Sequence, residues 1–215
     1  MNISVTQFSL YAEKCDTLSF FERGYFMNAY DFDETVYAGE CSIEFFLRCF
    51  KSDPSLIKFL PGVIKGFILY KQEKISLDSL VNDYGKVMED YFSSHSPEIE
   101  KAVVDFWDKH INKIKPFYLR QKKEDDVIIT ASPEFLMREV CNRLGIKNLI
   151  CTQMNAKTGK IEKPCFRESK TARFLERFPE GKIDEFYTDS MNDRFLMPFA
   201  EKVFIVKGSK IKRVK

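Results

Sequence analysis

Three short segments of the sequence carry the polar side chains best suited to chemistry. Asp31 and Asp33 are separated by a single residue. Residues 130–134, Thr-Ala-Ser-Pro-Glu, form a small-residue turn before a helical pattern, where free backbone N–H groups and a hydroxyl can hold an anion. Asp189 and Asp193 are four residues apart at the start of another helical pattern. Together the segments offer carboxylates for a cation and N–H groups for an anion.

Short apolar runs place these segments at the ends of predicted strands. The runs cover residues 26–30, 127–129, 186–187 and 203–206, and the first three end just before the polar segments. Helical patterns such as residues 133–144 separate the runs. This alternation is typical of βα units, so we expect the runs to be buried parallel strands.

The carboxyl ends of parallel strands meet in one crevice, which is where ligands bind in such sheets. Several carboxylates gathered there repel one another unless a cation lies among them. A hard divalent ion with oxygen ligands, Mg²⁺ for preference, fits this set. Each segment alone also fits a plainer role, a solvated turn for Asp31 and Asp33 and a helix cap for Thr130 and Asp189. Their order on successive strand ends favours a common site.

The long stretch between the first two predicted strands is helical throughout. Asp78 and Ser96 stand where helix N-caps are expected, and Pro97 suits a first helical turn. The helical patterns cover residues 43–50, 56–70, 80–92 and 99–114. The sequence therefore predicts an α/β fold: a Rossmann-like parallel sheet with helices on both faces, interrupted by an inserted all-helical segment.

Length and composition limit the possible classes of protein. The chain has 215 residues, 44% of them hydrophobic and 21 of them Phe, which is enough to bury one core domain. The formal net charge of +2 gives no general field for nucleic acid, so we expect no nucleic-acid partner.

Several kinds of site are excluded by missing residue patterns. No two of the nine glycines are two residues apart, so there is no G-x-G-x-x-G fingerprint, and neither a Walker phosphate loop nor a G-x-S-x-G elbow occurs. The six cysteines form no C-x-x-C pair and there are two histidines, which argues against zinc. Cysteines used as small buried hydrophobes suit a reducing compartment, and we expect a cytoplasmic protein.

No targeting or membrane-spanning segment is evident. Residues 1–26 lack a compact apolar run after a basic start and contain three acidic residues. The most apolar stretch, residues 56–70, is interrupted by Lys58, Pro61 and Lys65. We expect it to be a helix buried inside the fold, and a helix lying on a membrane surface is the alternative.

The ordered segments resemble the four motifs of the haloacid dehalogenase superfamily, and most closely the phosphoserine-phosphatase-like subgroup, which has a helical cap inserted after the first motif. The first motif corresponds to residues 30–36 (Tyr-Asp-Phe-Asp-Glu-Thr-Val), the second to 127–133, the third to Lys170 within 167–173, and the fourth to 187–193. The resemblance covers residues 27–206, and the four motifs in order are far more specific than any one alone.

The resemblance implies a Mg²⁺-dependent phosphatase with a covalent intermediate. Asp31 corresponds to the nucleophile that forms an aspartyl-phosphate, and Asp33 to the acid that protonates the leaving alcohol and then activates water. Asp31, the Asp33 carbonyl and Asp189 correspond to Mg²⁺ ligands, with Asp193 nearby or bound through water. Asp33 also favours phosphoester transfer over dehalogenation, which has no alcohol to protonate.

Phosphate binding is implied for a second group of residues. Thr130, the backbone N–H of Ala131 and the Lys170 ammonium correspond to groups that hold the phosphoryl oxygens. Without the other motifs, Lys170 fits an ordinary surface lysine. Glu40 matches an acidic position that contacts the substrate in phosphoserine phosphatases, although an exposed acid at the start of the cap is an equal alternative.

The substrate class stays open at this point. The arginine that phosphoserine phosphatases carry after a Ser-Leu pair is missing, because Val81 follows Ser79-Leu80. The cap resembles that of bacterial phosphatidylglycerophosphate phosphatases, which makes a lipid phosphate an alternative to a small-molecule phosphate. The basic tail, residues 207–215, then suggests peripheral membrane contact, whereas Gly208 within Lys-Gly-Ser favours a hairpin and a plain terminal strand.

The predicted organisation has three parts. Residues 27–39 and 120–215 form the α/β core, and residues 40–119 form the cap. Residues 1–26 are of doubtful status, because the family's first strand usually opens the chain and residues 22–24 can be encoded by a purine-rich run like a ribosome-binding site. We therefore expect translation to start at Met27, with an extra N-terminal helix as the alternative.

Two other functions remain compatible with the sequence. A non-catalytic module could keep the pocket to bind a phosphorylated ligand, although a pure sensor has no use for a general acid. A phosphotransferase could form the same aspartyl-phosphate and pass the group to another alcohol. The sequence does not separate these from hydrolysis, and it does not determine the oligomeric state.

Overall fold

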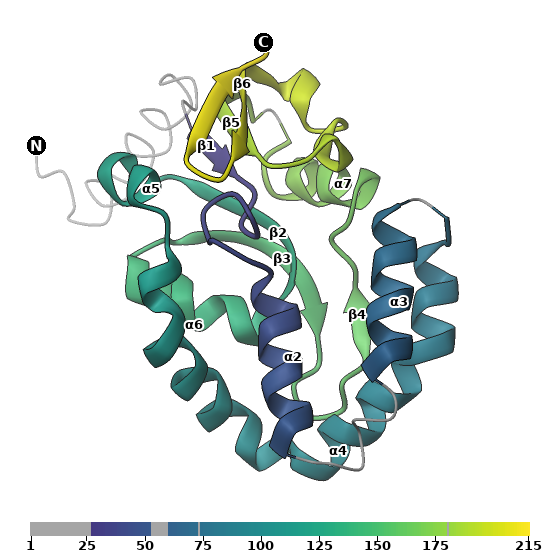
Figure 1. Ribbon diagram of the computed structural model, residues 1–215. Helices are drawn as coiled ribbons and strands as arrows, with labels where there is room; N and C mark the ends of the chain where they lie inside the picture. Colours follow the sequence, from purple (N-terminus) through teal and green to yellow (C-terminus); the bar gives the residue numbers. More distant parts are fainter. Residues whose placement is uncertain (1–26, 53–59, 73, 180) are drawn as a thin grey trace, which may run out of the picture.

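The computed structural model describes residues 27–52, 60–72, 74–179 and 181–215 (Figure 1). Within these ranges seven strands form one sheet in the order β4-β3-β2-β1-β5-β6-β7. The two predictions for residues 1–26, a translation start at Met27 or an extra helix, lie outside the described residues.

The central strands of the sheet are parallel, as the apolar runs predict. β1 pairs with β2 and β5 in parallel, β2 with β3, and β5 with β6, whereas the edge strands β4 and β7 are antiparallel to their neighbours. The sequence analysis identified β1, β2, β5 and β6 and favoured a terminal strand in the region of β7, and it did not identify β3 or β4. Their bounds are β1 Met27–Tyr30, β2 Val127–Pro133, β3 Asn148–Met154, β4 Ile161–Lys163, β5 Ile183–Thr188, β6 Ala200–Lys207 and β7 Lys210–Arg213.

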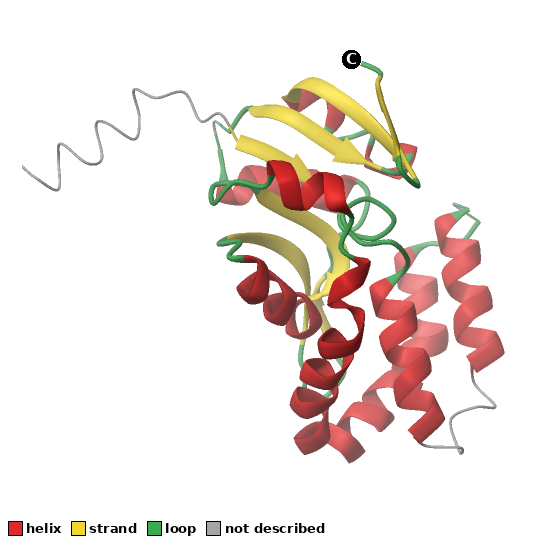
Figure 2. Ribbon diagram, turned by 60° about the vertical axis from the view of Figure 1, so that its left-hand side comes forward, coloured by secondary structure: helices red, strands yellow, loops and turns green. Residues whose placement is uncertain are grey.

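Helices fill the long connection between β1 and β2 and join the later strands. The connection contains α2 Cys41–Ser52, α3 Leu60–Lys71, α4 Leu77–His110, the 3₁₀ turn η2 Ile111–Lys113 and α5 Pro116–Gln121. The later elements are α6 Glu134–Leu144, α7 Glu168–Arg177, η3 Met191–Asp193 and η4 Met197–Phe199. Figures 1 and 2 show α2, α3 and α4 gathered at the end of the molecule away from the C-terminal strands.

The prediction of two helices starting at Asp78 and Ser96 is wrong. One helix, α4, runs from Leu77 to His110, and its N-cap is Ser76, whose hydroxyl accepts a hydrogen bond from the Ser79 N–H at 3.1 Å. Pro97 falls inside the helix, where a missing N–H and a bulky ring favour a kink rather than a stop. α4 changes direction along its length in Figure 1.

Buried side chains alternate between the two faces of the sheet, which confirms a sheet with helices on both faces. Tyr30 and Ile128 belong to a hydrophobic cluster with residues of α4, α5 and α6. Ala29 and Ile129, one residue away along the same strands, belong to a second cluster with Phe174 of α7. This separation follows from the two-residue period of a strand.

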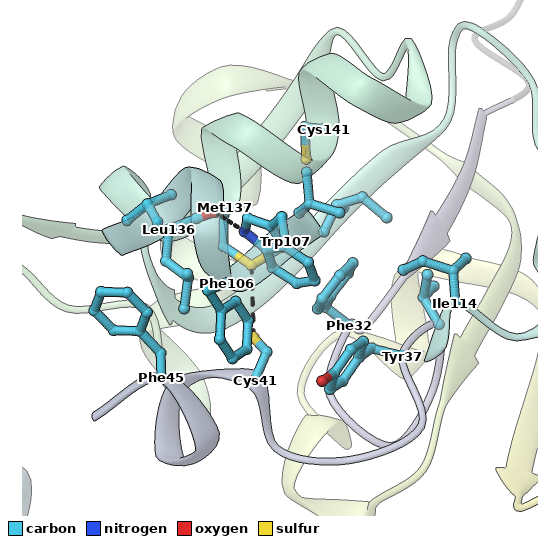
Figure 3. Packing of buried hydrophobic residues seen from close by; sticks show 14 of the residues in the cluster. Phe32, Tyr37, Cys41, Phe45, Phe106, Trp107, Ile114, Leu136, Met137 and Cys141 are labelled. Carbon is cyan, nitrogen blue, oxygen red and sulfur yellow. Dashed lines mark hydrogen bonds between the residues drawn. The ribbon is translucent and has the colours of Figure 1, made fainter. Parts of the chain in front are cut away.

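An aromatic cluster ties the inserted helices to the turn after β1 (Figure 3). The rings of Phe32 and Tyr37 stack with centroids 5.9 Å apart, and both meet the Trp107 indole of α4 edge-on. Trp107 Nε1 also donates a hydrogen bond to the Leu136 carbonyl of α6 at 2.8 Å. Val103, Phe106 and Trp107, within the helical pattern predicted for residues 99–114, are buried, so this part of α4 packs against the core.

The apolar stretch of residues 56–70 is not simply a buried helix. Residues 53–59 lie outside the described residues, and α3 begins at Leu60. Among its described side chains, Pro61 and Lys65 are exposed and Ile68 is 49% exposed. No helix among the described residues is long and apolar enough to cross a membrane.

Two smaller predictions are confirmed. β6 and β7 form an antiparallel hairpin with Gly208 at φ 59° in its turn, so the basic tail is a terminal strand. Among the described cysteines, five are free thiols and all are buried: Cys41, Cys49, Cys141, Cys151 and Cys165.

Candidate active site

The point where the strand order reverses lies at β1. From β1 the chain builds β2 and β3 on one side of the sheet and later β5 and β6 on the other. In such sheets the crevice beyond the carboxyl ends of the strands at this reversal is the usual ligand site. Asp31 follows β1, Thr130 lies within β2, and Asp189 follows β5. The three polar segments therefore meet at one edge of the sheet.

A tight turn after β1 orients the first two aspartates differently. The Asp31 N–H donates to the Tyr187 carbonyl of β5 at 2.9 Å, and the Phe32 carbonyl accepts N–H groups of the following turn. Glu34 has a φ of 57°, which is costly for a side-chain-bearing residue. Gly39, at φ 139°, closes the turn where a Cβ would lie 2.3 Å from Glu44 Oε1. This backbone separates the environments of Asp31 and Asp33.

Lys170 lies between two carboxylates at the centre of the site. Its Nζ is 2.8 Å from Asp31 Oδ1 and 2.7 Å from Asp193 Oδ1. All three side chains are buried, with residue exposures of 5% for Lys170, 7% for Asp31 and 3% for Asp193. Arg167, just before α7, has a φ of 45°, so a strained residue leads into the helix turn that carries Lys170. Lys170 of the third predicted motif therefore contacts Asp31 of the first motif.

The electrostatics of this centre are set by burial and by its imbalance of charge. Burial alone lowers the pKa of Lys170, but Asp193 and Asp31 more than offset this effect, so the pKa lies above its usual range and the ammonium stays charged. Burial raises the pKa of Asp31 well above its usual value; Lys170 opposes the shift, while Asp193 and Asp189 add to it. One ammonium therefore does not fully neutralise the surrounding carboxylates.

The two aspartates of the fourth motif are placed differently. Both oxygens of Asp193 are engaged, Oδ1 with Lys170 and Oδ2 with the Thr188 hydroxyl at 2.8 Å. Asp189 is half-buried, and its Oδ2 lies 3.9 Å from Lys207 Nζ. The helix expected here is a 3₁₀ turn, η3, rather than an α-helix. Asp189 is the better placed of the two to meet a cation.

Asp33 is held by neutral donors. The Cys41 N–H, at the start of α2, donates to Asp33 Oδ1 at 2.7 Å, and the Ser132 hydroxyl donates to Asp33 Oδ2 at 2.6 Å. Ser132 Oγ is also 2.6 Å from Ser42 Oγ. Asp33 therefore links the turn after β1 to β2 and to the first turn of α2.

The second motif is extended backbone rather than a turn. β2 continues to Pro133, with a shift in its pairing to β3 between Ile129 and Pro133, and α6 begins at the next residue. Thr130 is 1% exposed and its Oγ1 accepts the Ser132 N–H at 3.1 Å. Ala131 and Glu40 are both half-buried, the latter just before α2.

The predicted metal ligands Asp31, Asp189 and Asp193 differ in how their carboxylates are engaged. Among the described residues, no three His, Cys, Asp or Glu side chains come together in a way that could hold a metal ion by themselves. Mg²⁺ in phosphate-processing sites is commonly bound through only one or two carboxylates, with water and substrate oxygens completing the shell. Asp31 and Asp189, whose charges interact closely enough for Asp189 to raise the pKa of Asp31, match that smaller set.

Two functional contacts were missed by sequence reasoning. Ser132 was considered only for anion binding, yet its hydroxyl contacts Asp33, 99 residues away in sequence. Thr188 was part of the fourth motif without a role, and it holds Asp193. No local pattern indicates either contact, because both depend on how the segments pack. The only available signal was that Thr188 and Ser132 are polar residues close to the carboxyl ends of predicted strands.

A comparison with protein families identifies the class of this chain. The family model described as haloacid dehalogenase-like hydrolase matches residues 29–198. The protein therefore belongs to the haloacid dehalogenase-like hydrolases, and the resemblance drawn from the four motifs is confirmed. No curated protein is similar enough to this sequence to be counted as a relative.

Solved structures share the fold at low sequence identity. A protein of unknown function from Bordetella pertussis Tohama I has 20% identity and a TM-score of 0.64, with 81% of this chain and 86% of that chain covered. A phospho-aspartyl intermediate analogue of phosphoserine phosphatase has 13% identity and a TM-score of 0.58, with coverages of 84% and 86%. A phosphoserine phosphohydrolase-like protein from Francisella tularensis subsp. tularensis SCHU S4 has 15% identity and a TM-score of 0.54, with coverages of 83% and 85%.

Proposed function

We propose that the protein is a Mg²⁺-dependent phosphomonoester hydrolase that works through an aspartyl-phosphate on Asp31. The observation that carries the proposal is the burial of Asp31 against the Lys170 side chain, whose Nζ is 2.8 Å from Asp31 Oδ1, at the carboxyl end of β1 and two residues before Asp33. Family membership supports hydrolysis, and the similarity to a phospho-aspartyl intermediate analogue of phosphoserine phosphatase supports the phosphate ester as the bond that is broken.

The first half-reaction transfers the phosphoryl group to the protein. An Asp31 oxygen attacks phosphorus, a new O–P bond forms, and the bond to the substrate alcohol breaks. Asp33 supplies a proton to the departing alkoxide oxygen. Lys170, the Thr130 hydroxyl and the Ala131 N–H hold the phosphoryl oxygens as their charge spreads.

The second half-reaction releases phosphate. Asp33, now deprotonated, takes a proton from water as the water oxygen attacks phosphorus, and the bond to Asp31 breaks. In the free protein Asp193 and Asp31 hold the pKa of Lys170 above its usual range, so Lys170 enters the reaction as an ammonium. Asp193 contributes by orienting Lys170 through one carboxylate oxygen while Thr188 fixes the other.

Mg²⁺ would be held by Asp31, the main-chain carbonyl of Asp33 and Asp189. When bound, the ion offsets the repulsion between an attacking carboxylate and a phosphate dianion. With both oxygens of Asp193 engaged by Lys170 and Thr188, we assign Asp193 to positioning and not to direct coordination.

The inserted residues 40–119 are proposed to act as a cap that selects the substrate. The Cys41 N–H joins the beginning of this segment to Asp33, so the segment starts within the site. Glu40 precedes it and is proposed to contact a polar group of the substrate. The substrate is a phosphorylated small molecule or a lipid phosphate. Hydrolysis rates on small-molecule phosphates in detergent-free solution and on lipid phosphates in vesicles separate the two classes.

The test is hydrolysis of 4-nitrophenyl phosphate by the wild type and by Asp31→Asn, with Mg²⁺ and with excess EDTA. We expect turnover by the wild type that EDTA abolishes and added Mg²⁺ restores, and none by the variant. Asp125→Asn, an exposed carboxylate before the amino end of β2, is the control and should keep full activity. Absence of wild-type turnover on this ester and on the panel, or full activity of Asp31→Asn, would refute the proposal.

A further inference from the structure

A chain of neutral hydrogen bonds runs from the first turn of α2 to Asp33. Ser132 Oγ lies 2.6 Å from Asp33 Oδ2 and 2.6 Å from Ser42 Oγ. A hydroxyl has one proton, so when Ser132 donates to Asp33 the contact with Ser42 is made by the Ser42 proton. The direction of donation is thus Ser42 to Ser132 to Asp33.

The core fixes the atoms of this chain in place. Ser132 is 3% exposed at the end of β2. Its Oγ is 3.4 Å from the Sγ of Cys41, which is fully buried and lies 4.0 Å from Met137 Sδ (Figure 3). The Cys41 N–H, anchored in this way, reaches the other oxygen of Asp33. Neither contact follows from the roles assigned to Asp31, Thr130 or Lys170.

The two donors to Asp33, the Cys41 N–H and the Ser132 hydroxyl, differ in the hydrogen bonds that they can make with a carboxyl group. A backbone N–H can only donate, so its contact with Asp33 has one direction. A hydroxyl donates to a carboxylate and accepts from a carboxylic acid after rotating about its C–O bond. Rotation of the Ser132 and Ser42 hydroxyls therefore keeps the chain intact in both protonation states, with no movement of heavy atoms.

We infer that Ser132 is a positioning residue for Asp33, and that Ser42 orients the Ser132 hydroxyl, so that the start of the inserted helices is coupled to proton transfer. The inference rests on the proposed function, in which Asp33 acts first as an acid and then as a base. A group that alternates between two forms needs a partner that serves both, and Ser132 is placed to do so.

The readout is the dependence of kcat/KM on the leaving group, because a good leaving group needs little help from an acid. For Ser132→Ala we expect kcat/KM on an alkyl phosphate to fall about ten- to a hundredfold, and on 4-nitrophenyl phosphate by less than about threefold. Ser132→Thr, which keeps the hydroxyl, should restore most of the loss. Ser42→Ala should show the same selective pattern with a smaller amplitude.

A double variant tests whether Ser132 acts through Asp33. In an Asp33→Asn background, Ser132→Ala should cause no further loss on the alkyl phosphate, because the group it positions is already disabled. Thr152→Ser, a buried hydroxyl on β3 that accepts the Cys165 N–H, is the control and should leave both esters unchanged. Equal losses on the two esters, or additive losses in the double variant, would overturn the inference.

Failure of the inference is distinguishable from failure of the proposed function. If the wild type is active, Asp31→Asn is inactive and Ser132→Ala is unselective, Ser132 has no positioning role but the phosphatase stands. If the wild type hydrolyses neither ester, both fall together. If Ser132→Ala does not fold, as judged by thermal unfolding, Ser42→Ala decides, and an unselective Ser42→Ala counts against the inference.

Discussion

Two aspartates one residue apart lie in opposite kinds of surroundings. Asp31 belongs to a buried ionic centre, in which the Lys170 ammonium bridges it to Asp193. Asp33 is half-buried and is held by the Cys41 backbone N–H and the Ser132 hydroxyl. The turn through Glu34 separates the two sets of neighbours.

This difference shows how environment divides roles between identical side chains. A nucleophile benefits from a fixed position and a fixed positive charge beside it, whereas a group that gives and takes a proton needs partners that accept both forms. Pairs of carboxylates with contrasting neighbours are a general way of assigning such roles. We call Asp31, Lys170 and Asp193 the ionic half of the site, and Asp33 with its donors Cys41 and Ser132 the neutral half. Mutations in the ionic half should change both the stability and the reaction rate. Mutations in the neutral half should change mainly the reaction rate.

The largest effect is expected from Lys170→Met in the ionic half. Removing the ammonium leaves Asp31 and Asp193 buried together, so we expect a loss of about 3–5 kcal/mol in the free energy of unfolding. Hydrolysis of both esters should fall about a thousandfold or more. Urea unfolding at neutral pH without Mg²⁺ and steady-state kinetics measure the two effects.

The matched control is Lys202→Met, which removes a half-buried lysine near Asp184 and Glu185. A surface pair of this kind contributes at most about 1 kcal/mol. Equal destabilisation by the two variants would contradict the special status of the ionic centre.

In the neutral half, Asp33→Asn should separate rate from stability. The amide still accepts one hydrogen bond, so unfolding should shift little, while kcat/KM for an alkyl phosphate falls about a hundred- to a thousandfold. The loss on 4-nitrophenyl phosphate should be clearly smaller. A series of aryl and alkyl esters measures this as a steeper dependence of rate on leaving-group pKa, and an unchanged slope would remove Asp33 from the proton-transfer role.

The two aspartates of the fourth motif, Asp189 and Asp193, can be compared in the same way. We expect Asp193→Asn to lower kcat about ten- to a hundredfold by displacing Lys170, with the Mg²⁺ concentration for half-maximal activity unchanged. Asp189→Asn should instead raise that Mg²⁺ concentration. Titration of activity with Mg²⁺ decides, and a raised requirement in Asp193→Asn would make Asp193 a ligand after all.

The smallest effect is expected from Thr188→Val, which keeps the side-chain shape but removes the donor to Asp193 Oδ2. Activity should fall about two- to fivefold, because Asp193 keeps its contact with Lys170. Thr35→Val, which removes a weak contact of 3.4 Å to Asp31 Oδ2, is a useful reference in the same centre. A larger loss for Thr188→Val than for Asp193→Asn would show that Thr188 acts by another route.

Local patterns in the sequence predicted most of the strands and helices and named many of the residues of the candidate site. The strands before Asp31, Thr130 and Asp189 were predictable because buried parallel strands are short apolar runs with polar ends. The prediction of separate helices at residues 80–92 and 99–114 was wrong, because a serine and a proline signal a helix start in isolation, whereas here Ser96 and Pro97 lie inside one continuous helix. β3 was missed because its sequence, NLICTQM, mixes apolar and polar residues without a clear period.

By itself, the sequence determined the order of the elements and which polar residues follow which strands, since these depend on residues close together along the chain. Only the tertiary structure decided that Lys170 reaches Asp31 from 139 residues away and that Ser132 reaches Asp33 from 99 residues away. Such pairings depend on the strand order, on strained turns at Glu34 and Arg167, and on the packing that fixes Cys41. These are properties of the packed molecule, and residue types and spacing do not encode them locally.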